Sequence, residues 1–422
     1  MIEEVRLDDL IILQRGFDIT EKEQKSGCVP VISSGGISSY HDEFKVKGPG
    51  VVIGRKGTLG KVYFTSENYW PHDTSLWVKD FKGNDPKFIY YLLQVLHFEK
   101  FDAGAANPTL NRNHIHSLKL KVPKKQYRSK IASVLSAYDE LIENNKQRIM
   151  LLEEMTEEIY KEWFVRLRFP GYEKSNFFNN EDEKVAHGTK GALPGNWQQV
   201  KISDIFNTSS GGTPSRTNEA FYIEGNINWV KTKELLGSFV FSTEEKITEN
   251  ALKNSSAKIF PPHTILMGMY GGVHGEGRKS TLGQLGILTE SASTNQACCA
   301  FLPKMKEDYS FPYLFHYLKS KQTDFLNLSM GAAQQNISQD IIKNSAYLKP
   351  EVNILKKFEL IEIPLFEEIK VLMQKNQLLQ QTRDLLLPRL ISGKLSVEHL
   401  VEEDEAGLSL AAEPEVNYQA IK

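Results

Sequence analysis

Two sets of glycine-containing loops carry side chains that could contact phosphates and base edges. Glycine allows a backbone to approach a phosphate closely, and Arg, Asn and Gln suit the edges of bases. Each loop taken alone is as well explained by an ordinary turn, but the two sets occupy matched positions in the two halves of the chain. The candidate contact residues are Ser33, Ser34, Arg55, Lys56, Thr58, Lys61, Asn107, Thr109, Asn111 and Arg112 in the first half, and Thr213, Ser215, Arg216, Tyr270, Arg278, Lys279, Gln334, Gln335 and Asn336 in the second.

No catalytic or metal site is predicted. The glycine-rich stretch Gly272–Ser280 resembles a phosphate-binding loop, but Arg278 separates its last glycine from the lysine that such a loop requires. His114 and His116 are expected to alternate on a strand, and no carboxylate or cysteine is spaced to complete a metal site with them. A glycine-rich hairpin tip and surface histidines are the simpler interpretations.

The elements that would position these loops belong to a duplicated domain. At an offset of 227 residues, 11 of the 49 positions from 104 to 152 are identical, whereas average composition predicts roughly 3. Gly104-Ala105-Ala106 recurs as Gly331-Ala332-Ala333 within this match. The period far exceeds the 20 to 50 residues of a solenoid repeat, so each copy is a domain.

Each copy has the same order of predicted elements. A segment rich in Val, Ile, Gly and Ser is followed by a short aromatic helix, a strand that ends at Pro123 or Pro350, and a long helix. Mixed strands and helices without strict alternation indicate an α+β fold. The predicted divisions are a first globular domain at 1–125, a central helix at 126–170, a linker at 171–194, a second globular domain at 195–352, a distal helix at 353–395 and an acidic tail at 396–422.

Both long helices carry an apolar seam with heptad spacing, which favours antiparallel pairing of the two helices as a coiled coil. Asn145 lies on the first seam, where a buried amide can fix the register. The alternative is that each helix only covers its own domain. Residues expected to pair are Ile131, Tyr138, Asn145, Leu152 and Ile159 of the first helix, with Val134, Leu141 and Ile149 between them, and Leu365, Leu372, Leu379 and Leu386 of the second, with Phe358 and Ile361 before them and Ile369 beside the seam.

Composition places the chain among ordinary globular proteins of the cytoplasm. Of 422 residues, 40% are hydrophobic and 25% charged, and no apolar run approaches the roughly 18 residues of a membrane span. Three cysteines exclude a disulfide framework. The net charge is −2, but the acidic tail accounts for −6, so the preceding residues carry +4. Charge therefore leaves binding to nucleic acid open.

Several distinctive motifs occur along about residues 1–395. They are Lys130–Asn145, Leu151–Glu154, Tyr160–Arg166, Phe169-Pro170-Gly171, Leu193–Trp197, Gly212-Thr213-Pro214, Thr294–Ala297 and Leu387–Gly393. Together, these motifs resemble the specificity subunit of type I restriction-modification systems. One motif departs from this likeness, because the first copy has Gln14-Arg15-Gly16-Phe17-Asp18 where the second has Gly211-Gly212-Thr213-Pro214.

The resemblance implies two target recognition domains, each reading one half of a bipartite site in double-stranded DNA. The two long helices would fix the gap between the half-sites and dock two modification subunits, which bind S-adenosylmethionine and methylate adenine. Restriction subunits would add ATP- and Mg-dependent translocation and cleavage. The chain itself would be non-catalytic and hold no cofactor.

Three other interpretations stay open at this point. A helical scaffold with protein-binding ends would show no sequence-dependent affinity for DNA. A single-chain nuclease or methyltransferase would act without partners. A specificity subunit could also serve a complex that only methylates.

Overall fold

The computed structural model describes residues 2–101, 109–271, 281–329 and 336–398. They divide into two compact units, which we name unit 1 (the described part of residues 1–144 and 375–422) and unit 2 (residues 145–374). The division runs through both long helices, α4 (Lys125–Tyr160) and α10 (Val352–Ile391), so each helix contributes to both units. Among the described residues, no helix is long and apolar enough to cross a bilayer.

Unit 1 holds a four-stranded sheet of order β2-β8-β5-β6, a three-stranded sheet β4-β3-β7 and the pair β1-β9. Its strands are β1 (Ile2–Arg6), β2 (Ile12–Arg15), β3 (Val29–Ser33), β4 (Gly36–His41), β5 (Gly50–Gly54), β6 (Val62–Thr65), β7 (Trp70–Pro71), β8 (Ser75–Asp80) and β9 (Lys119–Pro123). Its shorter helices are α1 (Leu7–Leu10), α2 (Pro86–Gln94) and α3 (Arg112–His116), with a 3₁₀ turn at Phe98–Phe101.

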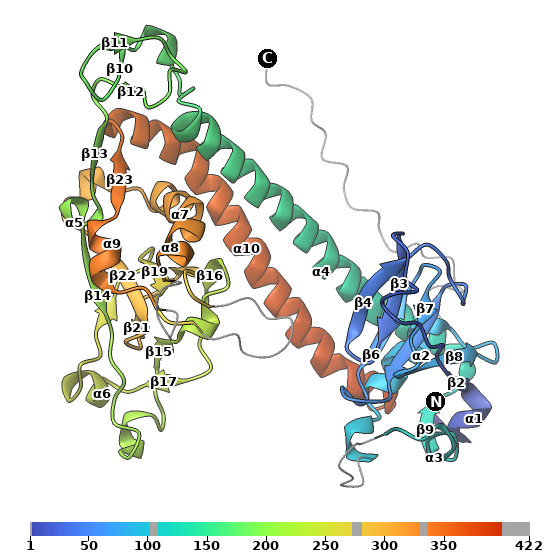
Figure 1. Cartoon of the computed structure of the whole chain (residues 1–422). Coiled ribbons are helices and arrows are strands. Elements are labelled where there is room, and N and C mark those ends of the chain that lie inside the picture. The colour runs from blue at the N-terminus through green and yellow to red at the C-terminus, as the bar shows by residue number, and fades with distance from the viewer. Residues whose placement is uncertain (1, 102–108, 272–280, 330–335, 399–422) are drawn as a thin grey trace. The chain divides into compact units, whose positions relative to one another are not determined.

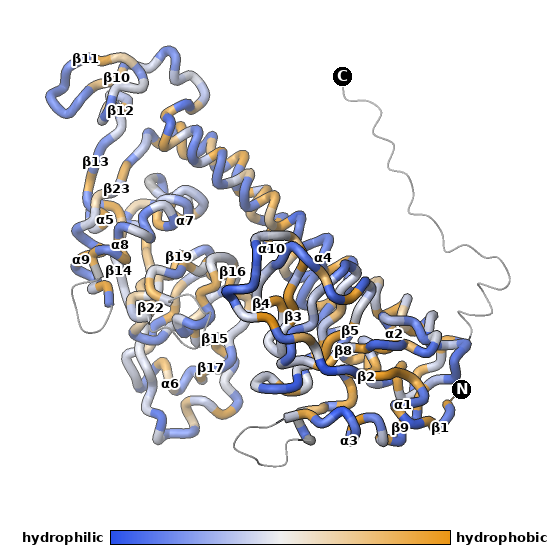
Figure 2. Tube along the Cα trace, turned by 45° about the vertical axis from the view of Figure 1, so that its right-hand side comes forward, coloured by the Kyte–Doolittle hydropathy of each residue, from blue (hydrophilic) through white to orange (hydrophobic). Residues whose placement is uncertain are grey.

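The core of unit 1 follows from its apolar runs. Strand β5 is a continuous Gly-Val-Val-Ile-Gly segment and is buried along its whole length. Figure 2 shows the hydropathy of the residues along this strand and its neighbours. Helix α2 begins where Asp85 accepts a hydrogen bond from Phe88 N at 3.0 Å, with Pro86 in the first turn. Its apolar face, including Phe88 and Leu92, packs into the same core.

Unit 2 holds a five-stranded sheet of order β14-β22-β19-β20-β16, a four-stranded sheet β17-β15-β21-β18 and two smaller sheets, β13-β23 and β11-β10-β12. Its strands are β10 (Phe177–Phe178), β11 (Lys184–Val185), β12 (Leu193–Pro194), β13 (Gln198–Lys201), β14 (Phe206–Ser210), β15 (Ile227–Val230), β16 (Ser238–Val240), β17 (Lys246–Ile247), β18 (Ile259–Phe260), β19 (Ile265–Gly268), β20 (Leu285–Leu288), β21 (Ala292–Thr294), β22 (Cys298–Pro303) and β23 (Ala346–Lys349). Its shorter helices are α5 (Ile202–Ile205), α6 (Glu249–Lys253), α7 (Phe311–Ser320), α8 (Gln322–Ser329) and α9 (Gln339–Asn344), with a π-helical turn at Lys161–Val165 and 3₁₀ turns at Tyr172–Lys174, Glu219–Phe221, Thr232–Glu234 and Lys306–Asp308.

The strand registers confirm the duplication element by element. In unit 1, β2 pairs with β8 and β8 with β5; in unit 2, β14 pairs with β22 and β22 with β19. Each unit also has a parallel pair at the same place, β3 with β7 and β15 with β21, and unit 2 has a second parallel pair, β16 with β20. Helices α4 and α10 begin 227 residues apart, the offset found in the sequence. The α+β architecture of two similar domains and two long helices is therefore confirmed.

Within each unit, α4 and α10 lie side by side and antiparallel (Figure 1). In unit 1, Arg383 pairs with Asp139, and Asn376 Nδ2 donates to Ile142 O at 3.3 Å. In unit 2, Arg148 pairs with Glu368 at 2.7 Å.

Most of the predicted seam is buried or half-buried, but two of its members are exposed. Leu141 is 54% exposed and Ile361 is 42% exposed, whereas their neighbours Ile142 and Glu362 are buried. The prediction was wrong at these positions because a straight helix drifts by about 20° per heptad from a strict seven-residue repeat. Buried seam residues are Ile131, Asn145, Phe358, Ile369 and Leu372, and half-buried ones are Val134, Tyr138, Ile149, Leu152, Ile159, Leu365, Leu379 and Leu386.

Each domain core is completed by the end of a long helix that begins in the other copy. In unit 1, Leu387, Leu390 and Ile391 of α10 join the cluster that contains Ile131 and Leu135 of α4. In unit 2, the aromatic end of α4 and the π-helical turn after it join the cluster around α7 and the start of α10. The helices therefore act as core elements as well as a pair.

Two local predictions need amendment. His114 and His116 lie on helix α3, not on a strand, and His116 Nε2 accepts a hydrogen bond from Leu13 N at 2.9 Å. The predicted linker 171–194 contains the small sheet β11-β10-β12, because Phe177 is buried there in contact with His187.

Candidate nucleic-acid interface

In unit 1, two of the predicted contact loops meet. The loop after β5 and the loop before α3 are joined by an antiparallel bridge between Lys56 and Thr109, and Leu110 N donates to Arg55 O at 3.0 Å. Arg55 N and Lys56 N both donate to Thr74 O, which fixes the first loop against β8. The structure thus places Arg55, Lys56 and Thr109 on neighbouring backbone segments.

The joined loops border a hollow with three arginines. Arg55 and Arg112 line it, together with Arg15 from the end of β2. Arg112 is the first residue of α3, which begins where Asn111 Oδ1 accepts from Asn113 N at 3.0 Å. Sequence reasoning missed Arg15 as a site residue, because it lies 40 residues before Arg55 on a strand whose register cannot be read locally.

Charge in the hollow is only partly compensated. Among the described residues, the Nη1 atom of Arg55 is buried and has no hydrogen-bond partner. Burial, together with the positive charge of Arg15, lowers the pKa of Arg55. No hydrogen bond or ion pair within the described part of the chain engages the Arg112 guanidinium. The hollow is therefore a site of excess positive charge.

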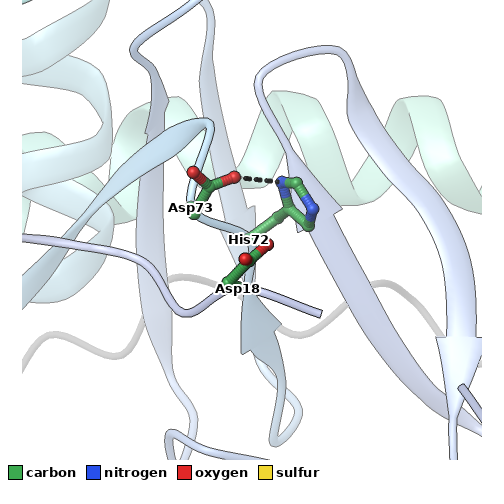
Figure 3. A group of neighbouring side chains, drawn as sticks. All are labelled: Asp18, His72 and Asp73. Atoms are coloured by element: carbon green, nitrogen blue, oxygen red, sulfur yellow. Dashed lines mark ion pairs between the residues drawn. The ribbon is translucent and has the colours of Figure 1, made fainter. Parts of the chain in front are cut away.

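Asp18, His72 and Asp73 form a group beside this hollow (Figure 3). Their nearest ligand atoms lie within 4.8 Å of one another, a spacing that a metal ion could use. Asp73 is already engaged on both oxygens, however: Oδ2 accepts from Arg15 at 2.5 Å, and Oδ1 lies 3.2 Å from His72 Nδ1. Although burial opposes it, the Arg15 hydrogen bond and the nearby His72 hold the pKa of Asp73 below its usual value. The Asp73 carboxylate therefore orients Arg15.

The other candidates of unit 1 have mixed environments. Ser33 Oγ donates to Gly36 O at 3.1 Å, and Ser34 is buried with its N–H donating to Thr74 Oγ1, so both hold the β3–β4 turn. Thr58 and Lys61 are exposed on the loop between β5 and β6. Asn107 lies outside the described residues.

Unit 2 repeats the joined loops with different side chains. Tyr270 and Asn336 form the antiparallel bridge that matches Lys56 and Thr109, and Ile337 N donates to Met269 O at 2.9 Å. Tyr270 is 48% exposed. The candidates Arg278, Lys279, Gln334 and Gln335 lie outside the described residues.

The remaining candidates of unit 2 are engaged with their own domain. Arg216 lies over the rings of Tyr222 and Trp229 at 4.6 and 5.0 Å and pairs with Glu245 at 2.5 Å. Thr213 Oγ1 donates to Gln296 Oε1 at 2.5 Å, and Ser215 Oγ lies 2.9 Å from Thr217 Oγ1. These contacts order the loop after β14.

The duplication and its paired loops match one protein family twice. The model of the type I restriction modification DNA specificity domain matches residues 2–154 and again residues 194–346, one match for each copy. This chain belongs to that family. Its paired loops are therefore those of a type I DNA specificity protein.

Relatives and a solved structure agree with the assignment. The MjaIX specificity subunit of Methanocaldococcus jannaschii is 26% identical over 320 residues, which cover 74% of this chain and 70% of that protein. The HindI specificity subunit of Haemophilus influenzae is 22% identical and covers 74% of this chain and 77% of its own length. The S subunit from M. genitalium superposes with a TM-score of 0.62 at 17% identity, over 93% of this chain and 96% of that one, which establishes a common fold.

Proposed function

We propose that each domain of this specificity subunit reads one half of a bipartite site in double-stranded DNA. The observation that carries the proposal is the pair of joined loops, present at the same register in both copies. Lys56 and Thr109 in unit 1 are replaced by Tyr270 and Asn336 in unit 2. Two domains that share one scaffold but differ in side chains at equivalent positions can recognise different DNA sequences. Base-edge contacts specify the sequence, whereas phosphate contacts fix the position of the protein on the DNA.

We further propose that α4 and α10 set the gap between the half-sites. Helix α4 has 36 residues and passes from unit 1 into unit 2 without interruption. At ~1.5 Å per residue such a helix is ~54 Å long, about 16 base pairs at ~3.4 Å each. A continuous helix pair is stiff enough to act as a spacer.

The same helices would dock two modification subunits. Several large apolar residues of α4 and α10 are exposed within each unit, such as Leu378 at 63% in unit 1 and Leu360 at 79% in unit 2. Isolated exposed residues are ordinary, but large apolar residues that are exposed repeatedly along a helix are typical of an interaction surface. Further exposed apolar residues of the two helices are Leu141 and Leu385 in unit 1 and Met150, Leu151, Met155 and Val371 in unit 2.

Chemistry would then reside in the partners. The modification subunits would bind S-adenosylmethionine and methylate adenine, and restriction subunits would use ATP and Mg. This chain would contribute recognition and no catalysis. The proposal is supported by loops built from Lys, Arg, Asn, Thr and Tyr at the ends of strands.

Selection from a random duplex library tests the proposal. The chain is purified together with its modification partner and incubated with the library and S-adenosylmethionine. The expected result is enrichment of two short defined half-sites separated by a constant undefined gap. One continuous half-site would mean that only one domain reads DNA, and no enrichment by the intact complex would refute the proposal.

A further inference from the structure

The two domains differ sharply at three equivalent positions. In the strand registers, Arg15 pairs with Leu76 in unit 1 and Ser210 pairs with Cys299 in unit 2. Ile53 and Met267 are equivalent, because each lies three residues before a matched bridge residue, Lys56 or Tyr270. Ile53 pairs with Leu76 and Met267 pairs with Cys299, so Leu76 and Cys299 are equivalent as well. Ser210 therefore occupies the place of Arg15.

The other two arginines of the hollow have equally clear counterparts. Leu110 N donates to Arg55 O, and Ile337 N donates to Met269 O, so Met269 stands where unit 1 has Arg55. Arg112 opens α3 after the capping residue Asn111, and Gln339 opens α9 after the capping residue Ser338. All three arginines are thus replaced by neutral residues in unit 2.

In unit 2, two of these three positions are hydrogen-bonded to each other. Gln339 Nε2 donates to Ser210 Oγ at 2.6 Å, and Thr208 Oγ1 donates to Gln339 Oε1 at 3.4 Å. Met269 is buried at 4% exposure. Among the described residues, the place that is a cationic hollow in unit 1 therefore carries neutral side chains in unit 2, and two of them are hydrogen-bonded to each other.

Resting on the proposed function, we infer that the hollow of unit 1 formed by Arg15, Arg55 and Arg112 binds a backbone phosphate of the DNA, and that the three equivalent residues of unit 2 form no such site. A phosphate brings negative charge and several acceptor oxygens to guanidinium groups, whereas a base edge is neutral and leaves converging positive charges uncompensated. The unpartnered Nη1 of Arg55 is the donor such an oxygen would satisfy. The Asp73 carboxylate holds Arg15 at the rim of the hollow.

The inference predicts that the two units contribute differently to the salt dependence of DNA binding. Each phosphate contact releases counterions and adds about 0.9 to the slope of log affinity against log salt. Unit 1 should therefore contribute to this slope through the three arginines, and the equivalent residues of unit 2 should not. A base-reading arginine would behave differently, because its loss changes sequence preference.

The experiment measures affinity of the complex for its selected duplex and for a scrambled duplex across a salt series. Arg112→Gln is expected to weaken binding to both duplexes by about tenfold and to lower the slope of log affinity against log salt by about 0.9. The preference for the selected duplex over the scrambled one should stay unchanged. Arg55→Met, which places the unit 2 residue in unit 1, should act in the same direction. Arg112→Lys should keep most of the slope, since it keeps the charge.

The matched control is Gln339→Ala in unit 2, which should leave the slope unchanged. If Arg112→Gln and Gln339→Ala lower the salt slope by the same amount, the inferred difference between the two units is overturned. An unchanged slope with altered base preference in Arg112→Gln would assign a base contact and overturn the phosphate site. If the wild-type complex does not distinguish the two duplexes but Arg112→Gln still lowers the slope, the phosphate site stands and the proposed sequence readout fails.

Discussion

Shortening both long helices by one heptad should shorten the gap in the DNA site. The deletion removes residues 144–150 from α4 together with 368–374 from α10. Both lie between the Asp139–Arg383 pair of unit 1 and the ring pair Phe164–Phe358 of unit 2, and the second segment includes the buried Ile369. Seven residues preserve the seam, because the helix rotates by only about 20° relative to a strict heptad repeat.

The expected change follows from helix geometry. Seven residues at ~1.5 Å each remove ~10 Å, which corresponds to about three base pairs at ~3.4 Å. Three base pairs also turn the duplex by about 100°, given 10 to 10.5 base pairs per turn. Affinity should therefore fall as well, because the second half-site no longer faces its domain in the same orientation.

Library selection with the modification partner present measures the outcome directly. Both half-site sequences should be retained while the undefined gap becomes about three base pairs shorter. A control variant carries seven extra Gly/Ser residues after Glu181, in the segment between β10 and β11, and should keep the original gap. An unchanged gap in the helix variant would refute the spacer role of α4 and α10.

Three further predictions concern single residues. Asn336→Ala should relax base preference in one half-site only, measured by the same selection; equal loss in both halves would indicate a folding role instead. Burial raises the pKa of Glu362 to about 8, so the folded state holds a proton that the unfolded state has lost, and stability should fall as pH rises from 6.5 to 8. The fall should approach ~1.4 kcal/mol per pH unit near pH 6.5, halve by pH 8, and be absent in Glu362→Gln. Amide exchange in α7 measures it, and the same pH dependence in the variant would contradict the prediction. Phe358→Ala should cost ~3–5 kcal/mol of unit 2 stability in thermal denaturation, because its ring is fully buried 4.9 Å from that of Phe164, and an unchanged melting temperature would count against this packing.

The duplication was the most informative feature of the sequence, because it predicted features that local patterns leave ambiguous. It matched the loops 55–58 and 107–112 with 278–281 and 334–336. The structure joins Lys56 to Thr109 and Tyr270 to Asn336 by the same kind of backbone bridge, so the residue that matches Lys56 is Tyr270. The long helices were also evident, since a sustained apolar seam without glycine has few other interpretations.

What the sequence could not provide were contacts between distant segments. Arg15 joins Arg55 only through the register of β2 on β8 and β8 on β5. His114 and His116 were assigned to a strand because five residues are too few for helical periodicity to appear, and a tertiary contact from Leu13 N helps to fix α3. Leu141 and Ile361 were assigned to the seam because a strict heptad was assumed along helices that also cover two domain cores.

The exchange of helix ends between the domains has a consequence for synthesis of the chain. The core that holds Ile131 and Leu135 includes Leu387, Leu390 and Ile391, which emerge from the ribosome about 250 residues later. At roughly 5–20 residues per second, that delay is on the order of 10 to 50 seconds. During this interval the first copy has an unfinished apolar surface, so the order of translation and the order of folding are opposed. The first domain made is among the last to be completed, and its exposed core would be a natural substrate for a chaperone.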